Sequence, residues 1–156
     1  MPHWAVKLPP SSLKHKLIME KAFQLIAEAA RLPGFRSELR KLLQEAGVGE
    51  KVTGEILVAV QEALTNIVRH SYAGKSGKID ILFKDFPDRI EMTIRDFGEK
   101  FDPSKIPPPE LPPQKPGGLG LYLIKTLMDK AEYTSPNSEG NLLYLMKYKR
   151  GKEGAR

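Results

Sequence analysis

The sequence predicts an α+β fold, a two-layer sandwich with helices on one face of a mostly antiparallel sheet. Two stretches of alternating apolar and polar residues, 78–84 and 89–96, surround a four-residue turn and indicate a β-hairpin. Helical periodicity precedes this hairpin over residues 51–70 and follows it over residues 118–129. Consecutive strands with helices before and after them are typical of an antiparallel sheet that is covered on one face.

The N-terminal part is expected to add one strand and two helices. Residues 4–8 alternate between apolar and polar and predict a short edge strand, which two prolines end. One of the two serines that follow can cap a helix over about residues 11–31. Residues 32–35 (Leu-Pro-Gly-Phe) are expected to break this helix, and a second helix is predicted over residues 37–46.

The C-terminal half combines an irregular segment with further regular elements. Residues 99–116 hold seven of the chain's 13 prolines and show little periodicity, which predicts a long loop that is either functional or disordered. Residues 131–134 and 142–148 predict two short strands joined by a turn. Because the chain has no internal repeat and no change of composition, we expect a single domain over residues 1–156.

Composition restricts the classes of function. A hydrophobic content of 40% in 156 residues is enough for a packed core. The formal net charge of +6 permits binding to a nucleotide, an acidic protein or a nucleic acid, and does not choose among them. The basic cluster near the C-terminus is interpreted as a solvated tail, in preference to a nucleic-acid-binding patch.

Three absences in the sequence narrow the classes further. The lack of cysteine excludes disulfides, thiolate catalysis and cysteine-based zinc sites. No apolar run approaches the ~20 residues that a membrane-spanning helix needs. The first residues also lack the charged-then-apolar form of a secretory signal, so a soluble, cytoplasmic protein is expected.

The helix predicted over residues 51–70 carries a candidate functional pair, Glu62 and Asn66. Residues four apart on a helix share one face. A carboxylate can accept a proton from an attacking hydroxyl, and an amide oxygen is a hard ligand suited to Mg²⁺. Asparagine is a poor residue for a helix interior, which favours a specific role. The alternative is a solvent-exposed helix face that includes both residues by chance.

Two further motifs lie where loops meet regular elements. Asp96-Phe97-Gly98 ends a predicted strand, and it is either a turn or a site where Asp96 accepts a hydrogen bond from an adenine amino group. The run Gly117-Gly118-Leu119-Gly120-Leu121 precedes a predicted helix, where glycines let a phosphate approach the backbone. Its spacing matches neither the P-loop nor the Rossmann fingerprint. The alternative is a flexible hinge at the end of the proline-rich loop.

In this order, the three motifs resemble those of the GHKL ATPases. Residues 60–72 are similar to the N-box of that superfamily, and the other two motifs are similar to its first and second glycine boxes. Within the superfamily, the chain most resembles bacterial anti-sigma-factor serine kinases, through the runs E-A-L-T-N-I-V-R-H-S-Y, D-F-G-E-K-F-D-P and G-G-L-G-L-Y-L-I-K-T-L-M-D. The resemblance covers about residues 51–149 and implies the Bergerat-type ATP-binding fold.

The resemblance also implies roles in binding ATP and Mg²⁺. Glu62 would be the general base toward a serine hydroxyl, and Asn66 would hold Mg²⁺. Asp96 would read adenine, Gly98 would leave room for the base, and residues 99–116 would form a lid over ATP. The other matching residues would lie near the phosphates: Arg69, His70, Gly117, Gly118, Leu119, Gly120 and Leu121.

The sequence departs from the family pattern at three places. The family often has an arginine before the second glycine box, where this chain has Pro116 preceded by Lys115, and Lys115 could act as a point charge instead. The family's last strand usually opens with Gly-Thr, whose hydroxyl supports the adenine-reading aspartate. Here Asn141 takes the place of that threonine and can still form a hydrogen bond. Residues 13–49 are longer than the family's usual single helix, so its modes of docking and dimerisation do not transfer directly.

The resemblance therefore predicts an ATP- and Mg²⁺-dependent serine/threonine protein kinase that acts as an anti-sigma factor. It would bind a sigma factor and phosphorylate a small STAS-type antagonist protein on serine, with no direct contact to nucleic acid or membrane. Whether the protein forms a homodimer is left open. The nucleotide-binding core would be residues 50–149, between an N-terminal part (1–49) and a basic tail (150–156).

Two alternatives follow from the same residues. The first is a non-catalytic ATP-binding regulatory module, which the missing arginine before the second glycine box favours. The second is the detached ATP-binding domain of a sensor histidine kinase. None of His3, His15 and His70 has the sequence setting of a phosphoacceptor, which argues against the second alternative.

Overall fold

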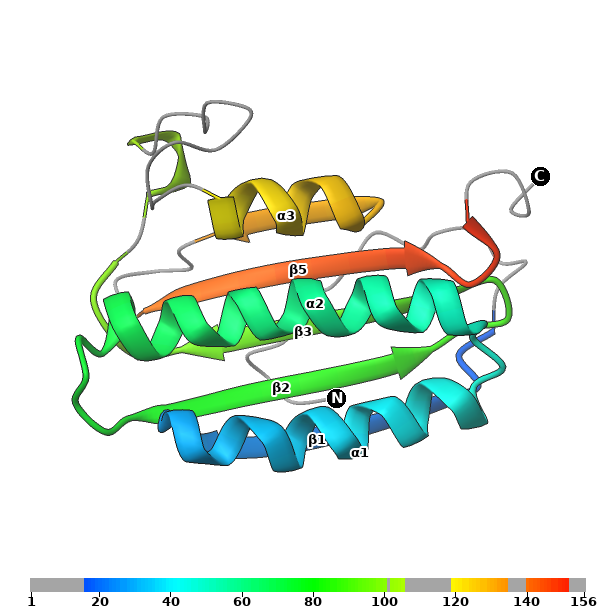
Figure 1. Cartoon of the computed structure of the whole chain (residues 1–156), viewed down its shortest axis with the longest axis horizontal. Helices are drawn as coiled ribbons and strands as arrows, with labels where there is room; N and C mark the ends of the chain where they lie inside the picture. The colour runs from blue at the N-terminus through cyan, green and yellow to red at the C-terminus, as the bar shows by residue number, and fades with distance from the viewer. Residues whose placement is uncertain (1–15, 101, 106–118, 135–139, 152–156) are drawn as a thin grey trace.

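The computed structural model describes residues 16–100, 102–105, 119–134 and 140–151. Within this part, five strands form a single sheet in the order β1-β2-β3-β5-β4 (Figure 1). All neighbouring strands in it run antiparallel. The strands are β1 (Met19–Ile26), β2 (Lys78–Asp85), β3 (Arg89–Asp96), β4 (Lys130–Thr134) and β5 (Asn141–Tyr148). The predicted α+β class with a mostly antiparallel sheet is thus confirmed.

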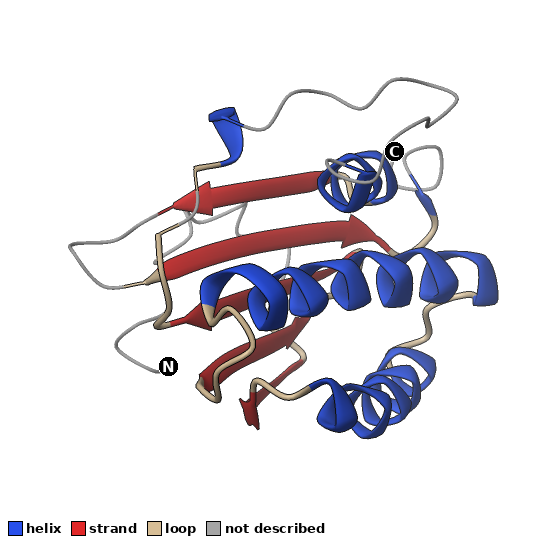
Figure 2. Ribbon diagram, turned by 60° about the vertical axis from the view of Figure 1, so that its left-hand side comes forward, coloured by secondary structure: helices blue, strands red, loops and turns tan. Residues whose placement is uncertain are grey.

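Three α-helices lie together on one face of this sheet, as the sequence predicts. Figure 2 shows the helices and the sheet as two layers. The helices are α1 (Leu32–Glu45), α2 (Glu50–Asn66) and α3 (Leu119–Leu127). Helix α2 continues into a wider, π-helical turn, Ile67–Ser71, and short 3-10 turns occupy Ala29–Arg31 and Pro103–Lys105.

The hydrophobic core lies between the two layers. Alternate residues of each central strand point to the helices, because successive side chains of a strand face opposite sides of the sheet. Each fully buried Leu, Ile or Phe contributes about 1.5–3 kcal/mol relative to an exposed one. The largest fully buried side chains of this core are Leu39, Leu43, Ile56, Leu57, Leu64, Ile79, Ile81, Phe83, Ile90, Met92 and Ile94.

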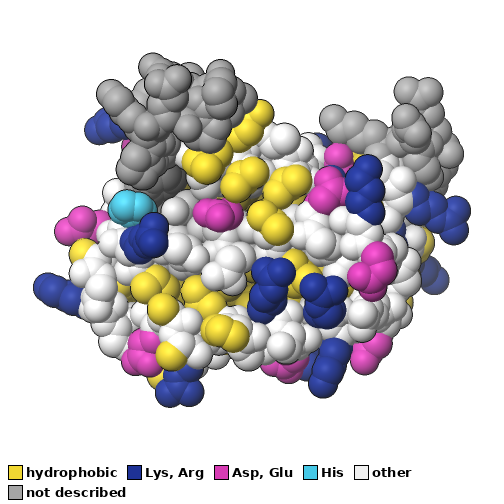
Figure 3. Space-filling model, viewed as in Figure 1, with side chains coloured by type: hydrophobic (Ala, Val, Ile, Leu, Met, Phe, Trp, Pro, Cys, Tyr) yellow, Lys and Arg dark blue, Asp and Glu magenta, His cyan; other side chains and the backbone are white. Residues whose placement is uncertain are grey.

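The surface of the helical layer mixes both signs of charge. Lysine and arginine side chains are interspersed with acidic ones, and hydrophobic side chains gather over α3 (Figure 3). Among the described residues, no helix combines the length and apolar character that a membrane span requires.

The helix predicted over residues 11–31 is wrong for its described part, where the chain forms strand β1. The segment Met19–Ile26 contains good helix formers such as Glu, Lys and Ala, and its apolar residues also fit a helical period. Pairing with β2 decides the outcome, because eight residues of β1 lie in register with β2 and half-bury Phe23 and Leu25 against the core. Tertiary context here overrides the local preference.

The predicted break at residues 32–35 is also wrong, since these residues form the first turn of α1. Pro33 is tolerated there because the first N–H groups of a helix have no partner within the helix. Leu32 and Phe35 are buried, which anchors this turn to the core. The predicted strand at residues 4–8 lies outside the described residues.

Candidate functional site

The ends of three strands and the C-terminal end of α2 enclose a pocket. It comprises about 360 Å³ of empty space, part of which is open to solvent. Its walls combine apolar side chains with a small polar group at one side. The lining residues are Ala63, Asn66, Ile67, His70, Ser71, Ile94, Asp96, Tyr133, Asn141 and Leu143. A mostly apolar pocket with a few convergent polar groups is the usual form of a small-molecule site.

Strand register brings Asp96 and Asn141 together in this pocket. Asp96 is the last residue of β3, and Asn141, the first of β5, lies directly opposite it. Both follow the parity of the core residues Ile94 and Leu143, so their side chains face the helical layer. Each is at least 95% buried, with exposed fractions of 3% for Asp96 and 5% for Asn141.

Three neutral donors surround the Asp96 carboxylate. The backbone N–H of Gly98 donates to Oδ1 over 3.0 Å. Asn141 Nδ2 donates to the same oxygen over 3.1 Å and also to the carbonyl of Glu99 over 2.8 Å. The Ser71 hydroxyl donates to Oδ2 over 3.3 Å. Burial raises the pKa of Asp96 above its ordinary value, and these hydrogen bonds lower it in part.

Two glycines let the chain pass close to Asp96. Gly140 has φ of +57°, and a Cβ there would lie 1.9 Å from the carbonyl oxygen of Asp96. A Cβ on Gly98 would lie 2.2 Å from the carbonyl oxygen of Ser71. Glycine at position 98 is therefore required by packing of the protein against itself, whatever ligand the pocket takes.

Helix packing brings the Glu62–Asn66 pair to the start of α3. Both side chains are half-buried on α2. A Cβ added at Gly120 would lie 2.8 Å from Glu62 Oε2 and 3.7 Å from the amide atoms of Asn66. The second glycine box, as far as it is described, thus lies against the N-box residues. Asn66 also lines the pocket, so it links this contact to the polar group around Asp96.

The other predicted site residues divide into three groups. His70 and Arg69 are both exposed, and of the two only His70 lines the pocket; Glu62 is half-buried and does not line it. Leu119 is half-buried and Leu121 is buried in the first turn of α3. Lys115, Gly117 and Gly118 lie outside the described residues, as does most of the predicted lid.

Three polar residues that the structure places at or beside the site were not assigned a role from the sequence. Ser71 contacts Asp96, and Tyr133 of β4 lines the pocket. The Tyr72 hydroxyl donates to the carbonyl of Lys78 over 2.6 Å and accepts from the backbone N–H of Phe97 over 2.8 Å. Ser71 and Tyr72 end the N-box run, so their position in that motif was the available signal.

The described residues contain no group of three His, Cys, Asp or Glu side chains close enough to hold a metal ion. Near the start of α3, the carboxylate of Glu62 and the amide of Asn66 offer oxygen atoms of the kind that hard cations bind. A hard cation that keeps most of its waters needs only one or two such ligands when it also binds phosphates.

Comparison with known proteins shows the family of this chain. The family model of the histidine kinase-like ATPase domain matches residues 25–147, which include the described pocket. A protein of Oceanobacillus iheyensis named serine-protein kinase RsbW is 38% identical over 122 residues, 72% of this chain and 76% of that protein. A protein of the same name from Staphylococcus epidermidis is 35% identical over 135 residues, 80% of this chain and 84% of that protein.

A solved structure supports the fold. The crystal structure of the RsbU and RsbW domains of a Mycobacterium tuberculosis protein matches with a TM-score of 0.62 and 20% identity. The match covers 83% of this chain, and this chain spans 31% of that one. At this identity the similarity concerns the fold alone.

Proposed function

Because this chain belongs to the histidine kinase-like ATPase family, we propose that it is a serine/threonine protein kinase of the anti-sigma-factor type. Relatives that it matches over about three quarters or more of their length are named serine-protein kinase. These names favour phosphorylation of serine over the histidine-kinase alternative. The observation that carries the proposal is the contact of Glu62 and Asn66 with the first turn of α3, beside the pocket that holds Asp96.

The pocket fits the adenine part of ATP. Asp96 offers a buried acceptor, which matches the exocyclic amino group of adenine. The apolar side chains of Ala63, Ile67 and Leu143 would cover the flat faces of the base. Since the donors to Asp96 come from the protein, the carboxylate stays oriented before a ligand arrives.

The triphosphate would extend from this pocket toward the start of α3. Phosphate is favoured at a helix N-terminus, where backbone N–H groups are free of partners within the helix. Asn66 would contribute its amide oxygen to Mg²⁺, which would neutralise charge on the phosphates. The absence of a side chain at Gly120 lets the start of α3 lie close to Glu62 and Asn66.

Glu62 would accept the proton of the substrate serine. The serine oxygen would attack the γ-phosphorus as the bond between the γ-phosphorus and the β–γ bridging oxygen breaks. ADP would leave, and phosphoserine would form. A general base of this kind contributes roughly 10²–10⁴-fold to a rate. The substrate would be a small STAS-type antagonist, and the second partner a sigma factor.

Purified protein incubated with radiolabelled ATP, Mg²⁺ and a candidate antagonist tests the proposal. We expect phosphoserine on the antagonist, and roughly 10²–10⁴-fold slower transfer with Glu62→Gln while ATP still binds. Asn66→Ala should instead weaken the Mg²⁺-dependent binding of ATP. Full transfer by Glu62→Gln would contradict the assigned base, and binding of ATP without transfer by the wild type would leave a regulatory ATP-binding module.

A further inference from the structure

Ser71 contacts the segment that carries Asp96 through both its side chain and its backbone. Its hydroxyl donates to Asp96 Oδ2 over 3.3 Å, and its carbonyl accepts the backbone N–H of Glu99 over 2.8 Å. Asn141 Nδ2 also lies 3.5 Å from the Ser71 hydroxyl oxygen. Ser71 is 8% exposed and ends the π-helical turn after α2. It therefore joins α2, β3 and β5 at one point.

The backbone around Ser71 leaves little freedom for this arrangement. Gly98 lies so close to the Ser71 carbonyl that a Cβ would not fit. The neighbouring Tyr72 hydroxyl holds the N–H of Phe97. The turn after α2 is thus fixed to the three residues that follow Asp96. A substitution that removes only the Ser71 hydroxyl leaves these backbone contacts in place.

The hydroxyl has a specific chemical effect on Asp96. A hydroxyl can donate one hydrogen bond, and the Ser71 hydroxyl donates it to a carboxylate oxygen of Asp96. Together with Gly98 N–H and Asn141, it presents Asp96 as an acceptor toward the pocket. An acceptor there favours a base with an amino group and disfavours a base that presents a carbonyl oxygen at the same place.

We propose that Ser71 is a positioning residue that sets the preference of the pocket for a nucleotide with an exocyclic amino group. It acts through Asp96 and need not touch the ligand. The inference rests on the proposed function, because it assumes that the pocket binds a nucleotide. It adds a specificity determinant at the junction of the N-box and the first glycine box.

Other ionisable side chains line the pocket with Asp96, and the pH dependence of ATP binding has to be separated from them. Tyr133 of β4 lines the same pocket. Burial raises the pKa of Tyr133 to about 12, with a smaller contribution from the charge of Asp96, so Tyr133 is neutral near pH 7. His70 lines the pocket from the turn after α2. A His70→Gln background removes this neighbouring ionisable side chain from the measurement.

The test compares two nucleotides on matched variants. Ser71→Ala removes the hydroxyl, and Ser76→Ala makes the same change at an exposed serine of the nearby turn. Calorimetry measures the affinity for ATP and for purine riboside triphosphate, which lacks the amino group. We expect Ser71→Ala to lower the ATP affinity roughly three- to tenfold, since the 3.3 Å bond is longer than usual. The affinity for the purine analogue should stay unchanged, as should both affinities of Ser76→Ala.

A second variant and a pH series complete the design. Ser71→Thr retains the hydroxyl and should restore the ratio of the two affinities, even if its extra methyl group weakens both. In the His70→Gln background, ATP binding should weaken as the pH falls and Asp96 gains a proton. This loss should occur at a higher pH in the Ser71→Ala variant than in the protein that retains Ser71, because the lost donor no longer stabilises the carboxylate. Thermal unfolding checks that each variant is folded.

The outcomes distinguish failure of the role of Ser71 from failure of the proposed function. Equal losses for both nucleotides, or no loss of ATP affinity, would overturn the role of Ser71 and leave the proposed function standing. A wild-type protein that binds neither nucleotide would overturn both. A lower ratio of ATP to purine affinity in Ser71→Ala, with recovery in Ser71→Thr, supports the role of Ser71.

Discussion

The two ends of strand β3 both bury charged side chains, yet they balance the charge differently. At the end near Arg89, charged groups pair with one another. At the other end, the partners of the Asp96 carboxylate are neutral within the part of the chain that the structure describes. The first arrangement is complete without a ligand. The second leaves a buried negative charge facing an open pocket, which suits ligand recognition.

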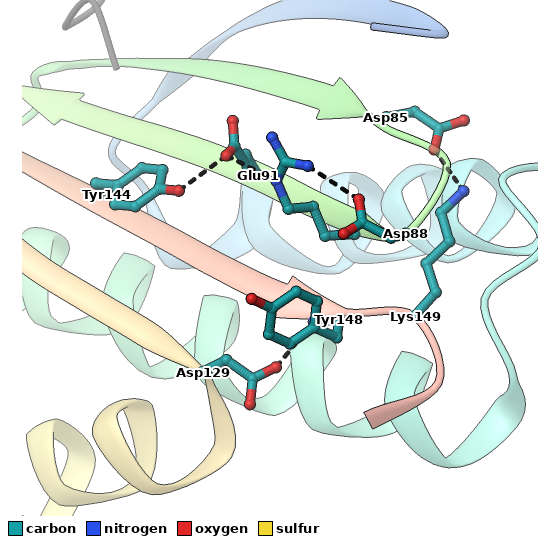
Figure 4. A network of polar contacts seen from close by, with 8 residues as sticks. Asp85, Asp88, Glu91, Asp129, Tyr144, Tyr148 and Lys149 are labelled. Atoms are coloured by element: carbon teal, nitrogen blue, oxygen red, sulfur yellow. Dashed lines mark hydrogen bonds and ion pairs between the residues drawn. The ribbon is translucent and has the colours of Figure 1, made fainter. Parts of the chain in front are cut away.

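The Arg89 end forms a network across β3 and β5 (Figure 4). Arg89 pairs with Glu91 at 3.1 Å and with Asp88 at 2.9 Å. The Tyr144 hydroxyl donates to Glu91 over 3.0 Å. Burial disfavours the charge of Arg89, but its two acidic partners outweigh burial and hold its pKa above the usual value. This network is thus a structural feature of the sheet.

The largest expected effect is loss of stability at the Arg89 end. Arg89→Met leaves Glu91 buried without its cation, and breaking a buried pair costs about 3–5 kcal/mol. We expect a loss of this size in the free energy of unfolding, measured with urea. The affinity for ATP, measured on folded protein, should not change, because this network lies at the opposite end of β3 from the pocket.

A double variant separates the lost pair from the lost packing. Glu91→Gln added to Arg89→Met removes the uncompensated charge and keeps an acceptor for Tyr144. Most of the lost stability should return. If the double variant is as unstable as the single one, the packing of the arginine side chain, and not charge, is what this end requires.

At the pocket end, Asp96→Asn should lower the affinity for ATP, which Arg89→Met leaves unchanged. An amide accepts fewer hydrogen bonds than a carboxylate, and a bond to a charged group is worth about 1.5–3 kcal/mol. The ATP affinity should therefore fall roughly ten- to hundredfold. Asp88→Asn is the matched change at the far end and should leave the affinity unaltered. Equal effects of the two substitutions on ATP affinity would remove the distinction between the ends.

The pH dependence of stability gives a smaller effect of defined sign. Because burial raises the pKa of Asp96, the folded protein holds this proton to higher pH than the unfolded chain. The stability that this group contributes is present below its unfolded pKa and is lost as pH rises through its folded pKa. Asp96→Asn lacks this titration. Its stability relative to the wild type should rise as the pH increases from about 4 toward neutrality, measured by urea unfolding at each pH. A difference that does not change with pH would contradict this expectation.

The sequence predicted the parts of the fold that depend on local periodicity. The hairpin of the strands at residues 78–84 and 89–96 was predicted from alternation on both sides of a four-residue turn, and α2 from its helical period. Strand β1 was missed because its identity depends on pairing with β2, a contact some 60 residues away in sequence. The role of Pro33 was missed because a proline ends one helix and begins another equally well.

In the candidate site too, residues in short motifs were predicted from the sequence, and contacts that depend on the fold were not. Short motifs identified Glu62, Asn66 and Asp96, and the structure brings Glu62 and Asn66 against α3 and places Asn66 and Asp96 in one pocket. Ser71 lies at the end of the N-box run, but its contact with Asp96 could not be predicted from that position, because the contact depends on the π-helical turn after α2. The assignment of these residues to ATP and Mg²⁺ stays a prediction that the experiments above address.

The smallest expected effect concerns an exposed ion pair, and it tests whether burial is what gives the Arg89 end its importance. Lys21 of β1 lies 3.4 Å from Glu38 of α1, with side-chain exposures of 46% and 52%. Solvent and salt screen such a pair, and exposed pairs contribute about 0.2–1 kcal/mol. Lys21→Gln should therefore change the free energy of unfolding by less than about 1 kcal/mol, and the change should shrink in high salt. Urea unfolding at low and high ionic strength measures both quantities. A loss as large as that of Arg89→Met would mean that charge pairing stabilises this fold whether or not the pair is buried, and the contrast between the two ends of β3 would then need another cause.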